Sequence, residues 1–163
     1  MTGSARALFE NELKDTYDAE IRLVDSLKEM AGRVNDADLR RGFERHHDQT
    51  KRQVERLEKV FRTIGVYPER EECEGVKGLI KEFDTFVKEE QPTDDVLDVF
   101  ASAAGLKTEH YEICSYTSLI NLAYRAGWDE TTATLKENLA EELATAKELE
   151  SMGEKLTTQL PKS

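Results

Sequence analysis

The stretch KTEHYEICSYTSLI, residues 107–120, carries two acidic residues where the helical period predicts buried side chains. Glu109 and Glu112 lie one turn apart on the broad apolar face of this predicted helix. Two buried carboxylates so close together repel each other, and this raises a pKa unless a cation lies between them. His110 points away from that face, so we interpret it as a surface or supporting residue. Tyr116 is interpreted as a core aromatic residue that could also donate a hydrogen bond to a ligand carboxylate.

Two other predicted helices carry an acid on an apolar stripe. Glu20 lies near the centre of the stripe in residues 4–34, and Glu142 lies on the stripe in residues 129–156. Its neighbour Glu141 falls outside the stripe and is predicted to be solvated. Buried carboxylates are usually paired or bound to metal, because an isolated buried charge is costly. The nearest basic residues in the sequence do not clearly share these stripes: Arg40, Lys51, Lys107 and Arg125.

The predicted helix 37–64 offers two adjacent histidines, His46 and His47. Glu44 and His47 have the spacing that lets one helical turn present a carboxylate and an imidazole to a metal pair. However, Glu44 points away from the apolar face, whereas His46 lies closer to that face. We therefore expect His46 to be the ligand candidate; the alternative, a hydrogen-bonded core histidine, stays open. Inward acids from several helices together with a histidine are typical of a carboxylate-bridged di-metal site.

The helical periods predict five helices in a single domain that spans residues 1–163. Their ranges are about 4–34, 37–64, 73–88, 94–126 and 129–156. Asp36 or Asp38 is expected to cap the second helix, and Gly65 and Gly127 are expected to end the second and fourth. The order long, long, short, long, long predicts an all-α antiparallel four-helix bundle with an extra short helix in its crossover.

The composition limits the classes of function. A net charge of -11 disfavours binding to nucleic acid, because no basic stripe is present to neutralise phosphates, and it disfavours docking on anionic membranes. A high-salt source would also explain so acidic a surface. The sequence shows no secretory signal and no apolar run of membrane-spanning length, and its two cysteines form no zinc or redox motif. We expect a soluble cytoplasmic protein in which Cys114 is a buried thiol.

Several motifs together resemble the YciE/YciF family of ferritin-like, stress-associated bacterial and archaeal proteins. The matching text covers nearly the whole chain and includes LKDTYDAE at 13–20, FERH at 43–46, QVERL at 53–57, GVKGLI at 75–80 and EHYEI at 109–113. The resemblance implies a ferritin-like bundle, similar to that of rubrerythrin and ferritin, whose bundles hold a di-iron centre. It also implies a homodimer. The biochemical activity of the family is not established.

Carried over position by position, the resemblance implies a set of metal ligands: Glu20, His46, Glu109, Glu112 and Glu142. Three positions depart from the pattern. The family commonly has acids where this chain has Gln49 and Ala146, and Thr145 stands where rubrerythrin-like proteins supply a histidine. One metal subsite is therefore expected to be weakened.

The leading hypothesis is a centre of two iron ions or of manganese, with zinc as a substitute, that handles Fe(II), oxygen or peroxide. In this hypothesis Glu142 bridges the metals, with Glu109 or Glu112 as an additional bridge, and Glu20 and His46 are terminal ligands. Whether the protein is an enzyme, of ferroxidase or peroxidase type, stays open. The alternative is a non-enzymatic helical dimer that acts as a stress-associated binding or structural protein. Iron storage in a ferritin-type cage is disfavoured, because the crossover helix departs from storage ferritins and a dimer encloses no cavity.

Overall fold

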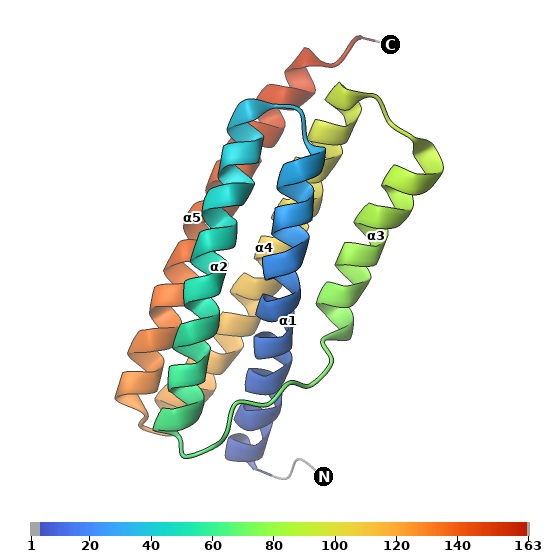
Figure 1. The fold of residues 1–163 in the computed structure, drawn as a ribbon. Helices are drawn as coiled ribbons and strands as arrows, with labels where there is room; N and C mark the ends of the chain where they lie inside the picture. The colour runs from blue at the N-terminus through green and yellow to red at the C-terminus, as the bar shows by residue number, and fades with distance from the viewer. Residues whose placement is uncertain (1–3, 163) are drawn as a thin grey trace.

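The computed structural model describes residues 4–162, and within them the chain forms five α-helices (Figure 1). These are α1 Ala5–Arg33, α2 Ala37–Thr63, α3 Glu74–Glu90, α4 Asp94–Arg125 and α5 Asp129–Gln159. The predicted helices are all present, and the largest difference is at the end of α5, predicted near 156 and found at Gln159. None of the helices in this described part has both the length and the apolar character that crossing a membrane requires.

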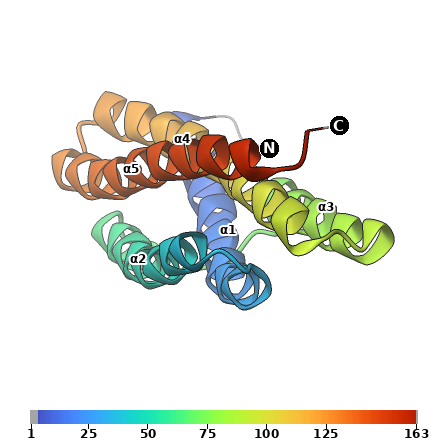
Figure 2. The same cartoon turned by 90° about the horizontal axis from the view of Figure 1, so that it is seen from above.

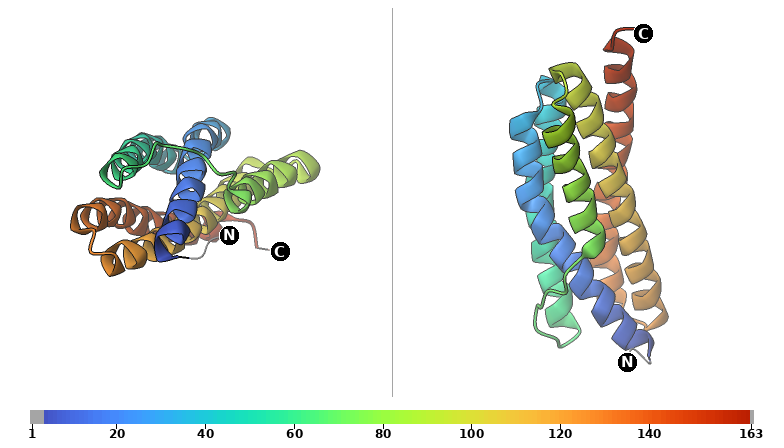
Figure 3. Two further views of the ribbon diagram at one scale, coloured as in Figure 1. Left: turned by 90° about the horizontal axis from the view of Figure 1, so that it is seen from below. Right: turned by 90° about the vertical axis from the view of Figure 1, so that its right-hand side faces the viewer.

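Two antiparallel hairpins make up the bundle (Figures 1 and 2). The first consists of α1 and α2, and the second of α4 and α5. The helix α3 belongs to the crossover between the hairpins and lies outside the four bundle helices, beside α1 and α4 (Figures 1 and 3). The predicted all-α four-helix bundle with an extra crossover helix is therefore confirmed.

Two aspartates fix the turn between α1 and α2. Asp36 caps α2, because its carboxylate accepts hydrogen bonds from the backbone N–H groups of Asp38 and Leu39, both at 2.9 Å. Asp98 on α4 is buried and accepts from the N–H groups of Asn35 and Asp36, both at 2.7 Å. The second hairpin thus holds the turn of the first. Of the two predicted caps for α2, Asp36 is the one that acts.

Two glycines end long helices as predicted. Gly65 follows α2 with φ +76°, and Gly127 follows α4 with φ +73°. These are left-handed conformations, which glycine adopts without the steric cost that a Cβ atom would add.

Asp18 on α1 anchors the segment that leads into α3. Its buried carboxylate accepts from the N–H group of Cys73 at 2.9 Å and forms ion pairs with Arg22 and Arg70 at 2.5 and 2.8 Å. Burial favours the neutral acid, but these hydrogen bonds outweigh it and hold the pKa of Asp18 below its usual value. The anchor fixes where α3 starts along the bundle.

The core consists of two apolar clusters with a polar layer between them. One cluster fills the end of the bundle near the α1–α2 turn and contains Leu23, Leu27, Leu39, Phe43, Ala101, Ala104 and Leu149 among others. The other fills the opposite end and contains Phe9, Leu13, Leu57, Phe61, Tyr116, Leu119 and Leu135 among others. All four bundle helices contribute to the buried polar layer, which contains Glu20, His46, Thr50, Gln53, Glu109, Glu112, Asn138, Glu142 and Thr145.

The prediction of a buried Cys114 is wrong, because this thiol is exposed. Cys114 lies two residues after Glu112, about 200° around the helix at the period of an α-helix. Glu112 faces the polar layer, so Cys114 faces away from it. Residues of α4 are apolar on several sides, and the period alone therefore did not distinguish the buried side from the exposed one.

Candidate metal centre

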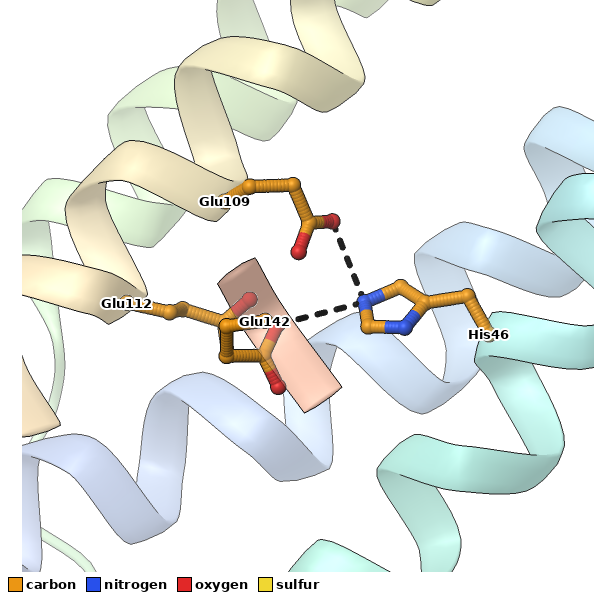
Figure 4. Close-up of side chains that lie close together, drawn as sticks. All are labelled: His46, Glu109, Glu112 and Glu142. Atoms are coloured by element: carbon orange, nitrogen blue, oxygen red, sulfur yellow. Dashed lines mark ion pairs between the residues drawn. The ribbon is translucent and has the colours of Figure 1, made fainter. Parts of the chain in front are cut away.

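Four side chains from three helices converge in the polar layer. His46 comes from α2, Glu109 and Glu112 come from α4, and Glu142 comes from α5 (Figure 4). One nitrogen or oxygen atom of each lies within 4.8 Å of the corresponding atoms of the others, and all four residues are buried. Carboxylate and imidazole donors at this separation could all reach metal ions placed between them. The structure therefore brings together four of the five residues predicted from the sequence.

The imidazole of His46 presents Nε2 to the carboxylates. This nitrogen lies 3.1 Å from Glu109 Oε1 and 3.6 Å from Glu142 Oε2 (Figure 4). On the other side of the ring, Nδ1 lies 3.4 Å from Gln49 Oε1 and 3.3 Å from Thr145 Oγ1. The hydroxyl of Thr145 already donates its proton to a backbone carbonyl, so it can only accept from Nδ1. Both neighbours thus favour a proton on Nδ1.

This tautomer leaves the lone pair of His46 Nε2 directed at carboxyl oxygens. Such an arrangement needs a proton on one of the facing carboxyl groups or a cation between the ring and the acids. An imidazole whose far nitrogen donates to a protein acceptor is the usual arrangement of a histidine metal ligand. His47 is half-buried, lies 3.2 Å from Asp48 and stays outside the cluster, which agrees with the choice of His46 over His47.

Glu20 on α1, the fifth predicted residue, is fully buried beside the cluster. The hydroxyl of Tyr116 donates a short hydrogen bond to Glu20 Oε1, and Oε2 has no partner. The proximity of Glu142 raises the pKa of Glu20 further than burial alone. Glu20 therefore belongs to the same group of acids, with one oxygen held and the other free.

The four acids are held in an environment that disfavours their charged forms. Burial, followed by repulsion from Glu142, raises the pKa of Glu20 to about 8. Burial also raises the pKa of Glu109 to about 7, although a hydrogen bond with Glu142 acts in the opposite direction. Burial and neighbouring carboxylates also raise the pKa of Glu112 and of Glu142 well above the usual value. Without a cation, the cluster must take up protons or lose stability as the pH rises.

Within residues 4–162, no lysine or arginine forms an ion pair with any of these four acids. Instead, five of their buried oxygens have no hydrogen-bond partner: Glu20 Oε2, Glu109 Oε2, Glu112 Oε1 and Oε2, and Glu142 Oε2. Buried polar atoms are nearly always satisfied in folded proteins, so this concentration needs a cause. Unpaired carboxylate oxygens around an imidazole lone pair form a donor set that fits iron, manganese or zinc.

A chain of hydrogen bonds links Glu20 to the surface. Arg56 Nη1 donates to Asn138 Oδ1 at 3.0 Å, and Asn138 Nδ2 donates to Tyr116 Oη at 2.9 Å. Tyr116 then donates to Glu20. Arg56 is itself held by Glu141 through two hydrogen bonds of 2.8 and 3.0 Å. The prediction that Glu141 is solvated is thus wrong, since its side chain is only 22% exposed and pairs with Arg56.

Gln53 and Asn138 were not among the predicted site residues, and both are fully buried in the polar layer. Gln53 Nε2 donates to Glu142 Oε1, which leaves Glu142 Oε2 free. A signal was present, because Asn138 lies four residues before Glu142 on the same face of α5, and Gln53 lies between Thr50 and Leu57 on α2. Amides on apolar stripes indicate buried hydrogen bonds as clearly as acids do.

Comparisons with known proteins agree with this fold. The sequence model of the family described as "Domain of unknown function (DUF892)" matches residues 4–160. Protein YciF of Escherichia coli strain K12 is 35% identical over 139 residues, which cover 85% of this chain and 83% of YciF.

Two solved structures are also similar. The crystal structure of the E. coli stress protein YciF superposes with a TM-score of 0.91 at 31% identity, over 97% of this chain and 99% of that one. The structure of YcfI from Rhodopseudomonas palustris, described as a candidate structural protein, superposes with a TM-score of 0.89 at 34% identity. This match covers 91% of this chain and 94% of that one.

Proposed function

This chain belongs to the DUF892 family, and from that premise we propose that it is a stress-associated protein with a carboxylate-bridged centre of two metal ions. Iron or manganese is the expected metal, because the donor set is rich in carboxylates and contains a single imidazole. The proposed ligands are Glu20, His46, Glu109, Glu112 and Glu142.

The observation that carries this proposal concerns the two carboxylate oxygens of Glu112. Both of its carboxylate oxygens are buried and without a partner, in contact range of His46, Glu109 and Glu142. An uncompensated buried carboxylate destabilises a protein by several kcal/mol, so a sequence that keeps it favours a compensating ligand. A divalent cation compensates the charge and satisfies the free oxygens together.

The hydrogen bonds favour a change in the expected roles. Glu142 has one oxygen held by Gln53 and Glu20 has one held by Tyr116, whereas Glu112 has both oxygens free. With metal bound, Glu112 would therefore offer both oxygens to the ions, whereas Glu142 and Glu20 would each offer the oxygen that is not held.

Bound iron or manganese would supply one-electron chemistry toward dioxygen or peroxide. The protein would orient the ligands: Gln49 and Thr145 hold the His46 ring, and Tyr116 holds Glu20. The chain has only two cysteines, too few for the four-cysteine iron–sulfur module that reduces rubrerythrin. Repeated turnover would thus require an external electron donor.

Elemental analysis of protein purified without chelators tests the proposal. We expect about two iron or manganese ions per chain, with loss of metal in Glu112→Ala and Glu142→Ala while helicity is retained. Glu44→Gln is the matched control, because Glu44 is an exposed acid on the same helix as His46. Absence of metal after anaerobic reconstitution with Fe(II) would contradict the proposal.

A non-enzymatic role is the second candidate, and the similarity to YcfI favours it. The bundle would then act as a homodimer that binds or supports another protein, and the polar layer would be a degenerate metal site. Gln49, Thr145 and Ala146 support this candidate, because they offer no charged ligand where the family pattern has acids and a histidine. A purified dimer that contains no metal and keeps its fold in Glu112→Ala would favour this candidate.

A further inference from the structure

A small cavity of about 20 Å³ lies beside the carboxylate cluster, between α1, α3 and α4. His46, Glu109 and Glu112 form one side of its wall. A cavity above roughly 10–15 Å³ holds one water-sized molecule, so this one excludes organic substrates and admits a diatomic or triatomic guest. Such a guest would lie directly against three of the proposed ligands.

The rest of the wall is predominantly apolar. Leu23, Leu27 and Met30 line it from α1, and Leu79, Ile80 and Phe83 line it from α3. Two hydroxyl groups also border the cavity, those of Ser26 and Thr108, and the hydroxyl of Thr108 already donates to the backbone carbonyl of Ala104 at 3.1 Å. Few free hydrogen-bond donors therefore face the space.

This wall discriminates between small molecules. With metal ions held by Glu109 and Glu112, the carboxylate oxygens of this wall would no longer be free to accept, so the two donors of water or of hydrogen peroxide would face aliphatic side chains and lose hydrogen bonds. Dioxygen has no hydrogen bonds to lose, and small apolar cavities take up apolar gases such as xenon. The polar side of the cavity lies against the proposed metal ligands, where a bound dioxygen could react.

We propose that this cavity is a dioxygen-binding site that serves the metal centre, and the assignment rests on the proposed function. It gives a role to α3, which lies beside α1 and α4 (Figures 1 and 3). Side chains of this helix line one side of the cavity. The four bundle helices alone would leave that side without Leu79, Ile80 and Phe83. The crossover helix thus encloses the approach to the carboxylates.

Xenon binding to the full-length chain, reconstituted with metal, tests the site without relying on activity. Crystals under xenon pressure should show one xenon atom between Leu27, Ile80 and Glu112. Ala104→Leu and Ile80→Phe should each abolish it, because they add volume to the wall from α4 and from α3. Val87→Leu is the matched control: Val87 packs against the same apolar cluster from α3 without lining the cavity, and this variant should keep the xenon.

Two variants on different helices keep the test decisive if one of them fails to fold. An ordered water that xenon does not displace would overturn the assignment, and so would xenon binding that persists in both filled variants. Elemental analysis of the same wild-type preparation separates the two proposals. Metal without xenon would overturn the dioxygen site and leave the metal centre in place, whereas a chain that takes up no metal would overturn the proposed function and, with it, this assignment.

Discussion

Tyr116 donates its hydroxyl proton to Glu20, and Asn138 fixes this direction. A phenol has one proton, and Asn138 Nδ2 occupies its accepting side at 2.9 Å. Asn138 cannot turn its amide over without losing the bond from Arg56 to Oδ1. The ion pair between Arg56 and Glu141 near the surface thereby supports the chain that holds one oxygen of Glu20 and leaves the other free for a ligand.

Tyr116→Phe should weaken metal binding while it preserves the ring packing in the apolar cluster. Without the phenol, Glu20 loses the bond that holds Oε1, and loss of such supporting hydrogen bonds typically reduces metal affinity about 10–100-fold. Competition titration against a chelator measures the change. Tyr124→Phe is the control, because Tyr124 is 74% exposed and far along α4. Equal affinity in both variants would contradict the role of Tyr116.

Asn138→Asp tests the direction of the hydrogen-bond chain. An ionised Asp at position 138 has no donor, so it would accept from Arg56 and compete with Glu20 for the proton of Tyr116. We expect a loss of metal affinity at least as large as that in Tyr116→Phe. Glu137→Gln alters the other acid that pairs with Arg56, at 3.3 Å, and should have little effect because Glu137 is 64% exposed. An unchanged affinity in Asn138→Asp would show that the direction of the chain does not matter.

The stability of the metal-free protein should fall as the pH rises. The folded state raises the pKa of Glu109 to about 7 and of Glu20 to about 8, above the ordinary value of 4.5. An acid with a raised pKa contributes stability that is fully present below about pH 4.5 and is lost as the pH passes through 7 to 8. Urea unfolding in the presence of a chelator, between about pH 5 and pH 9, measures this.

Metal should remove this pH dependence, because bound carboxylates are already ionised in the folded state. The matched control is Glu44→Gln without metal, which should keep the full dependence, since Glu44 lies on the surface. A metal-free protein that becomes more stable across this pH range would contradict the raised pKa values.

The sequence predicted the fold well because its signals are local. Helical period, Asp36 as a cap, and Gly65 and Gly127 as stops are each decided by a few neighbouring residues. The ligand candidates could also be predicted, because an acid on an apolar stripe is unfavourable there wherever the partner helices lie.

The hydrogen bonds that support the ligand candidates could not be predicted from the sequence in this way. Arg56 and Asn138 are 82 residues apart, and their contact depends on how α2 and α5 are placed against each other. The interpretation of Glu141 was wrong for the same reason, since its partner lies on another helix. The cavity likewise depends on α3, whose position beside α1 and α4 is set by long-range contacts, both those of Asp18 with the segment before α3 and those of the apolar residues of α3 with the core.

Glu112→Met should stabilise the metal-free protein and abolish metal binding. Replacement of buried ionic groups by apolar side chains of similar volume is often neutral or stabilising by about 1–4 kcal/mol. Glu112 is 1% exposed, and burial together with repulsion from the neighbouring acids raises its pKa well above the usual value, so the variant removes both the desolvation penalty and this repulsion. Thermal unfolding with chelator, together with metal analysis, measures both effects. If metal binds, the order of stability should reverse on adding it, because only the wild type gains the binding free energy. A destabilised Glu112→Met protein without metal would indicate instead that the carboxylate is satisfied in the folded chain, and the metal proposal would lose its main support.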